Sequence, residues 1–127
     1  MNTKKVPLIA ERHLGARYFI DSPKIKCCSF IFMMYHEAGL STDFSLQPVI
    51  TTPDQLVEEN NIGKIIFLLR KTLEGYLFSH LAIVYDDQSV IHYSRHCAPN
   101  KLRRVLINSF SELLEVYDLV PNPYISK

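Results

Sequence analysis

The sequence predicts an α+β domain in which helices come first and an antiparallel sheet of about five strands follows. Apolar residues recur at helical spacing between residues 27 and 38, and short apolar runs typical of strands follow residue 63. No linker, repeat or low-complexity stretch divides the 127 residues. A chain of this length can bury a core without disulfides, so we expect residues 1–127 to form one domain.

Three helices are predicted before the strands. Pro7 stands in the first turn of a short helix over residues 7–16, and the apolar spacing over 27–38 predicts a largely buried helix that Gly39 ends. Residues 52–55, Thr-Pro-Asp-Gln, have the pattern of a capping box with proline at the first helical position, which predicts a helix to about residue 60.

The second half of the chain predicts an antiparallel meander. We expect strands over residues 64–69, 78–85, 89–94 and about 102–107. A helix should then begin at Ser109 or Ser111 and end near Glu115, followed by a last strand over 116–120 and an irregular tail.

Composition excludes several classes of function. Apolar residues make up 47% and charged residues 21% of the chain, and the net charge is only +1, which argues against nucleic acid as a partner. The longest apolar runs, 30–35 and 65–69, are far shorter than a membrane span. The first ten residues have no signal-peptide core, so we expect a cytoplasmic protein or one exported by a non-classical or injection route. The oligomeric state is not predicted.

The cysteines point to free thiols. Cys27, Cys28 and Cys97 are odd in number and contain no C-x-x-C pair, which argues against a disulfide framework and a structural zinc site. Cys27 stands at the start of the buried helix, where unpaired N–H groups and the neighbouring Lys26 favour a thiolate and could hold an oxyanion. The alternative is that Cys27 and Cys28 are apolar fillers of the core.

Two histidines could serve such a thiol. His80 and His92 fall in neighbouring predicted strands, and a three-residue loop over 86–88 would place them diagonally on one face, roughly 7–8 Å apart at Cα. A loop of two or four residues would place them on opposite faces, so catalysis requires an odd loop. With the cysteine they would supply nucleophile, base and orienting group. A metal cluster of His92, His96 and Cys97 is a weaker alternative, and His13 and His36 are interpreted as surface residues.

These segments resemble the NlpC family of papain-like cell-wall peptidases, from about residue 16 to residue 119. The segment KCCSF at 26–30, continuing to YHEAGL at 35–40, is similar to the helix that carries the family nucleophile. The segments GKIIF at 63–67, SHLAIV at 79–84 and IHYS at 91–94 are similar to the strands that follow and that carry the second and third catalytic residues.

The resemblance implies a papain-like fold and a role for each matched residue. It implies a cysteine peptidase with Cys27 as nucleophile, His80 as base and His92 as orienting residue. It places Tyr18, Cys28 and Ser79 at the substrate, and it needs no metal or organic cofactor. The implied substrate is a peptide or amide, such as the γ-D-glutamyl-diamino acid link of peptidoglycan.

The chain departs from the family pattern in the loops that bind the acyl donor. Lys26 replaces an aspartate, Ser29 and Ala82 replace glycines, and Lys64 replaces an acidic residue. Two alternatives therefore stay open: an amidase or thioesterase of this family that acts on a non-wall substrate, and a binding module of the same fold that has lost turnover.

Overall fold

The computed structural model describes residues 2–17, 27–43, 50–73, 75 and 79–121. Within these ranges, only the backbone is described for a few residues: Cys27, Cys28, Pro53, Leu56, Glu59 and Ser79. The elements in chain order are α1 (Val6–Glu11), α2 (Cys27–Glu37), the 3-10 helices η2 (Pro53–Val57) and η3 (Glu59–Asn61), β1 (Ile65–Arg70), β2 (Ser79–Val84), β3 (Ser89–Ser94), β4 (Arg104–Ser109), α3 (Phe110–Val116) and β5 (Tyr117–Val120). No helix in these ranges is long and apolar enough to cross a membrane.

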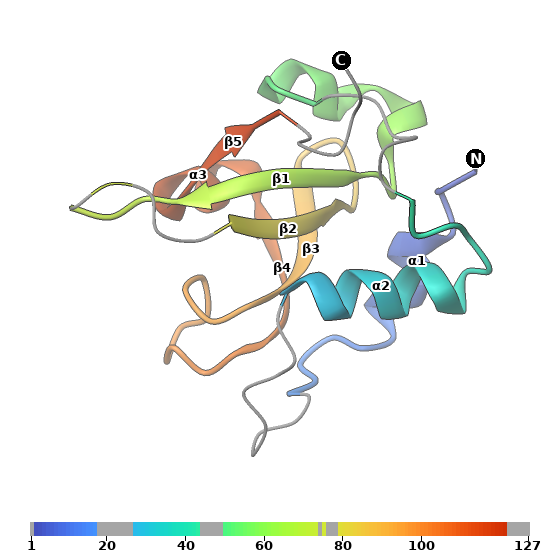
Figure 1. Cartoon of the computed structure of the whole chain (residues 1–127), viewed down its shortest axis with the longest axis horizontal. Helices are drawn as coiled ribbons and strands as arrows, with labels where there is room; N and C mark the ends of the chain where they lie inside the picture. The colour runs from blue at the N-terminus through green and yellow to red at the C-terminus, as the bar shows by residue number, and fades with distance from the viewer. Residues whose placement is uncertain (1, 18–26, 44–49, 74, 76–78, 122–127) are drawn as a thin grey trace.

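The strands form one open antiparallel sheet in the order β4-β3-β2-β1-β5, which confirms the α+β prediction with five strands (Figure 1). The first four strands are a meander in which each pairs with the next. The last strand returns to pair with β1, so that Leu68 lies opposite Leu119 on one side and opposite His80 on the other. β1, β2 and β3 are therefore interior strands that are paired on both edges.

Two predicted helices are shorter or less regular than expected. The first ends at Glu11 because the chain turns away to pair with β4: the N–H of Gly15 donates to Val105 at 3.0 Å. The segment after Thr52 forms two 3-10 turns rather than one α-helix, since Glu58 has extended backbone angles between them. Gln55 still accepts from the N–H of Thr52 at 3.1 Å, as the capping pattern predicted.

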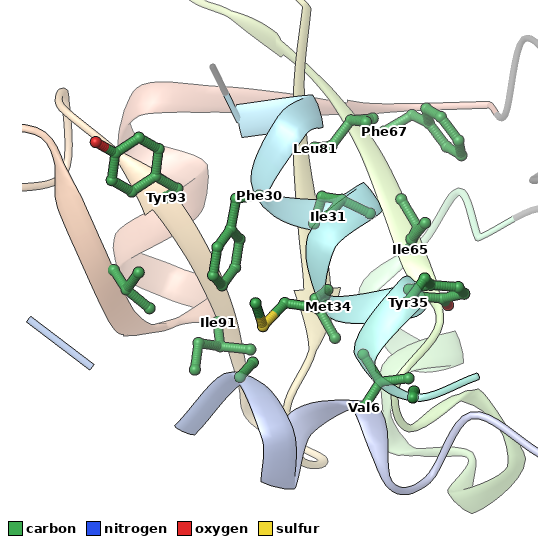
Figure 2. Close-up of a cluster of buried hydrophobic side chains, with 14 residues drawn as sticks. Val6, Phe30, Ile31, Met34, Tyr35, Ile65, Phe67, Leu81, Ile91 and Tyr93 are labelled. Atoms are coloured by element: carbon green, nitrogen blue, oxygen red, sulfur yellow. The ribbon is translucent and has the colours of Figure 1, made fainter. Parts of the chain in front are cut away.

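One face of the sheet packs against α1 and α2 (Figures 1 and 2). The members of this cluster are buried apolar residues from both helices and from β1–β4: Val6, Ala10, Phe30, Ile31, Met34, Tyr35, Ala38, Ile65, Phe67, Leu81, Ile83, Ile91, Tyr93 and Val105. Alternate positions of the same strands face the other side, where α3 supplies Phe110 and Leu113 to a second buried cluster. Residues that alternate with Leu81, Ile83 and Ile91 therefore lie on the α3 face.

The contacts of α2 fix its direction along the sheet. Near its start, the ring of Phe30 lies 6.2 Å from the ring of Tyr93 in β3. Near its end, the hydroxyl of Tyr35 donates to the carbonyl of Gly63, just before β1, at 2.7 Å. The first turn of α2, where Cys27 stands, is thus at the end of the sheet at which β3 ends and β2 begins.

Candidate functional site

Continued past the assigned strand ends, the pairing of β2 with β3 reaches Tyr85 and Ser89 and leaves a three-residue loop, 86–88, which is the odd number that the prediction needs. Ile83 pairs with Ile91 and Val84 with Val90, and the N–H of Tyr85 donates to the carbonyl of Ser89 at 3.0 Å. If this register continues toward the start of β2, His92 lies opposite Ala82. His80 and His92 are then diagonal neighbours on the same face of the sheet.

The two imidazoles are in direct contact. Nε2 of His80 lies 2.8 Å from Nδ1 of His92, and the ring centroids are 5.0 Å apart with an interplanar angle of 70°. The distance between the two nitrogens is that of a hydrogen bond. The contact uses Nε2 of His80 and leaves Nδ1 as the ring nitrogen that could act on another group.

Asn108 in β4 determines which nitrogens carry the protons. Its Oδ1, an acceptor only, lies 2.7 Å from Nε2 of His92, so that nitrogen must donate. In a neutral ring Nδ1 of His92 is then the acceptor, and Nε2 of His80 must donate to it. In this series of hydrogen bonds, Nδ1 of His80 carries no proton and keeps its lone pair, which is the form a general base needs.

Tyr117, which is hydrogen-bonded to Ser94, restricts the ring of His80 by stacking on one of its faces. The Tyr117 ring stacks on the His80 ring at 4.5 Å with an interplanar angle of 8°. The Tyr117 hydroxyl is 3.2 Å from Oγ of Ser94, which also accepts from the N–H of Cys97 at 3.3 Å. Because Tyr117 is buried and joined to β3 in this way, the imidazole has little freedom to turn about its side-chain bonds.

Burial keeps both histidines neutral. His92 is 0% and His80 6% exposed, and Asn108 is 9% exposed. Burial lowers the pKa of His92 to about 4, although the hydrogen bond to Asn108 opposes this shift. Burial also lowers the pKa of His80 well below its ordinary value, and its electrostatic interactions with His92, His96 and Arg103 act in the same direction. Neutral rings at pH 7 are the condition under which the donor and acceptor roles described above hold.

The remaining predicted site residues are located only in part. Cys27 is the first residue of α2 and Ser79 the first of β2, but the side chains of Cys27, Cys28 and Ser79 lie outside the described part of the structure. Tyr18 lies wholly outside the described residues. The structure brings His80 and His92 together, while the position of the thiol relative to them stays a prediction.

The face of the sheet limits how a thiol could reach the histidines. His80 alternates with Leu81, which packs in the cluster of α2, so its ring lies on the opposite face, over Tyr117. His80 is the second residue of β2, so only Ser79 lies between it and the end of the sheet at which α2 begins. Cys27 would therefore approach Nδ1 of His80 around the end of β2 rather than across the sheet.

The alternative metal cluster does not form. Among the residues described, no three His, Cys, Asp or Glu side chains come close enough to hold a metal ion. Cys97 is partly buried, and burial raises the pKa of its thiol. Of the two histidines interpreted as surface residues, His36 is exposed and His13 is partly buried, where it meets Glu37 at 3.3 Å.

Sequence reasoning missed Asn108, Ser94 and Tyr117 as members of the site. A signal for Asn108 was present, because it is an amide at the end of an apolar strand pattern, where a buried polar side chain needs a partner. No local pattern indicated Tyr117, which comes from the last strand and reaches the site only through the pairing of β5 with β1.

Comparison of the chain with protein-family models, curated proteins and solved structures gives no significant match.

Proposed function

We propose that the chain is a papain-like cysteine hydrolase of amide bonds, with Cys27 as nucleophile, His80 as general base and His92 as the residue that orients it. The observation that carries the proposal is the buried hydrogen-bonded series from Asn108 through His92 to His80. A neutral imidazole held by a second polar group, with one basic nitrogen left over, is the arrangement on which nucleophilic catalysis depends.

The helix supports the choice of nucleophile. Cys27 begins α2, an 11-residue helix whose first turn has N–H groups without helical partners. These groups favour a thiolate there, and they could stabilise the oxyanion of a tetrahedral intermediate. Lys26 precedes Cys27 in the sequence, and its positive charge would also favour the thiolate.

The proposed reaction has two stages. Nδ1 of His80 takes the thiol proton, and the sulfur of Cys27 attacks the carbonyl carbon of the substrate. The proton then passes to the leaving amine as the C–N bond breaks, which leaves a thioester on Cys27. Water attacks the thioester with His80 again as base, and the acid and the free thiol are released.

Tight burial of the base has a chemical consequence. Because the pKa of His80 is well below its ordinary value, the ring is neutral at pH 7 and can accept a proton. The imidazolium that forms would donate to Nδ1 of the neutral His92 at 2.8 Å. The neighbouring thiolate or oxyanion would balance its charge and so favour the proton transfer.

The substrate class follows from the resemblance to the NlpC family. We propose an amide substrate, with the γ-D-glutamyl-diamino acid bond of peptidoglycan peptides as the first candidate. An amide or thioester of non-wall origin would use the same groups in the same order.

The reactivity of the thiol tests the proposal. In a Cys28→Ser, Cys97→Ser background, Cys27 should be alkylated by iodoacetamide at pH 6, well below the ordinary thiol pKa of about 8.5. His80→Gln should slow the reaction at pH 6 by at least about tenfold, whereas the exposed control His36→Gln should leave the rate unchanged. Slow alkylation that His80→Gln does not alter would overturn the enzyme proposal.

Turnover is tested with defined peptides. The protein is incubated with γ-D-glutamyl-diamino acid peptides, and the products are identified by mass spectrometry. Cleavage that Cys27→Ala abolishes and Cys28→Ala does not would support both the chemistry and the nucleophile. Loss with Cys28→Ala alone would move the nucleophile by one residue. If the thiol is reactive but the peptides stay intact, the proposed wall substrate is rejected and the proposed hydrolase activity is retained.

A further inference from the structure

The proposed reaction places a positive charge on a buried ring. When Nδ1 of His80 takes the thiol proton, the side chain becomes an imidazolium at a position that is 6% exposed. Burial lowers the pKa of His80, and electrostatic interactions with three neighbouring residues act in the same direction: His92, His96 and Arg103. A buried charge without compensating groups is strongly unfavourable. A group that favours the imidazolium over the neutral imidazole would therefore speed the reaction.

Two aromatic rings contact the ring of His80 in the part of the chain that the structure describes. Nδ1 of His92 lies 2.8 Å from Nε2 of His80 and accepts the proton of that nitrogen. The ring of Tyr117 instead lies on a face of the imidazole, with the ring centroids 4.5 Å apart and the planes inclined by 8°. The imidazolium would thus have a hydrogen-bond acceptor at its edge and an aromatic ring on its face.

The stacked arrangement favours the charged form of His80. The face of an aromatic ring carries partial negative charge, and it attracts a cation that lies within about 6 Å of the ring centroid. The imidazole of His80 is well within this distance of the Tyr117 ring. The neutral imidazole gains only stacking from this contact, whereas the imidazolium also gains the attraction of its charge to the ring face.

The surroundings of Tyr117 strengthen this attraction and hold the ring in place. Tyr117 is 2% exposed, and its backbone is paired in the sheet opposite Arg70 of β1. Its hydroxyl lies 3.2 Å from Oγ of Ser94, which is 1% exposed. Attraction between a cation and a ring face is stronger at such desolvated positions than at the protein surface.

We propose that Tyr117 is a positioning residue of the hydrolase and that its ring face stabilises the imidazolium of His80 during proton transfer. The inference rests on the proposed function and adds an electrostatic role to the stacking contact. In the step concerned, the S–H bond of Cys27 breaks and the proton moves to Nδ1 of His80, so that a thiolate and an imidazolium form together. Tyr117 itself gives and takes no proton.

Fluorination of the ring at position 117 tests this role, because fluorine atoms withdraw negative charge from the ring face and change the size of the ring little. In the Cys28→Ser, Cys97→Ser background, Tyr117→Phe is compared with the same variant carrying one, two or three ring fluorines. The rate of Cys27 alkylation by iodoacetamide is measured at pH 6. Tyr117→Phe should react like the background protein, and the rate should then fall with each fluorine, by about fivefold over the series.

The same measurement at pH 10 separates charge stabilisation from a structural effect. Because the ordinary thiol pKa is about 8.5, most of the thiol is ionised at pH 10 without transfer of its proton to His80. None of the phenylalanine rings ionises, so the rates across the series should be equal at this pH. A disturbance of the site by fluorine would instead slow alkylation at both pH values.

Phe110 provides a matched control site. It belongs to the buried cluster on the same face of the sheet as Tyr117 and is 8% exposed. The same fluorinated phenylalanines at this position should leave alkylation of Cys27 at pH 6 unchanged. Circular dichroism checks that every variant is folded. If the more heavily fluorinated rings prevent folding at position 117, Tyr117→Phe and its 4-fluoro form still decide, because that fluorine takes the place of the hydroxyl.

The outcomes distinguish this inference from the hydrolase proposal. Equal rates at pH 6 across the folded series, or a slowing at pH 10 as large as that at pH 6, would overturn the role of the Tyr117 ring. The hydrolase proposal would stand in either case if His80→Gln still slows alkylation at pH 6. A thiol that reacts slowly at pH 6 and responds to neither position 80 nor position 117 would overturn both.

Discussion

Replacement of Asn108 tests the proton arrangement of the site directly. In Asn108→Leu the volume stays similar, but Nε2 of His92 loses its acceptor at 2.7 Å. The variant can leave that buried N–H unsatisfied, or the proton of His92 can move to Nδ1. In the second case Nδ1 becomes a donor toward His80, whose own proton must move to Nδ1. The nitrogen that should take the thiol proton is then blocked.

The magnitude follows from the burial of this donor. A buried N–H without an acceptor costs about 1–3 kcal/mol, and this is the free energy that favours the working proton arrangement. Loss of that free energy corresponds to a decrease of about 5- to 150-fold in the rate of a reaction that needs Nδ1 of His80 as base. Asn108→Asp keeps an acceptor at the same place, so we expect it to retain the proton arrangement and to raise the pKa of His92.

Nitrogen-15 NMR of ring-labelled histidine reads the proton positions, and alkylation of Cys27 at pH 6 reads their effect. Wild-type protein should show both His80 and His92 protonated at Nε2. Asn108→Leu should move the protons to Nδ1 and slow alkylation, Asn108→Asp should do neither, and the exposed control Asn60→Leu should resemble the wild type.

Circular dichroism must show that Asn108→Leu is folded at the temperature of the assay. If it is not, Asn108→Asp still tests the proton arrangement, since it should keep the wild-type NMR pattern. The reasoning is refuted if folded Asn108→Leu keeps both Nε2 protons and the wild-type alkylation rate, or if the wild type itself carries its His80 proton on Nδ1.

Further predictions concern Gly63 with Gly39 as its control, His92 and Tyr117. Gly63 has φ of +85°, and an added Cβ would lie 1.8 Å from the carbonyl oxygen of Thr3, so Gly63→Ala should lower the free energy of unfolding in urea by more than about 2 kcal/mol. Gly39→Ala, with φ of +70° but open space, should cost only about 1 kcal/mol. The pKa of His92 is about 4 in the folded protein and 6.5 in the unfolded chain. This difference contributes about 3 kcal/mol to the free energy of unfolding above pH 6.5, and the contribution decreases as the pH falls from 6.5 toward 4. His92→Gln should therefore flatten the pH dependence of stability in urea melts. Tyr117→Phe keeps the stacked ring and should cost about 1 kcal/mol with unchanged thiol reactivity, whereas Tyr117→Leu should lower both stability and reactivity.

Local patterns predicted most of the elements because they depend on neighbours in the chain. The strand over 89–94 agrees with the structure residue for residue, and α3 begins directly after Ser109, one of its two predicted starts. Apolar spacing also predicted the start of α2 at Cys27. The first helix was predicted too long, because its end depends on pairing of Gly15 with the distant strand β4.

The sequence by itself determined the α+β order of elements, the strand alternation and the pair of histidines, since each depends on residue spacing or turn chemistry within about fifteen residues. Only the tertiary structure decided that the loop has three residues, that Asn108 accepts from His92, and that Tyr117 stacks on His80. These contacts join strands whose register is set by packing of both sheet faces at once.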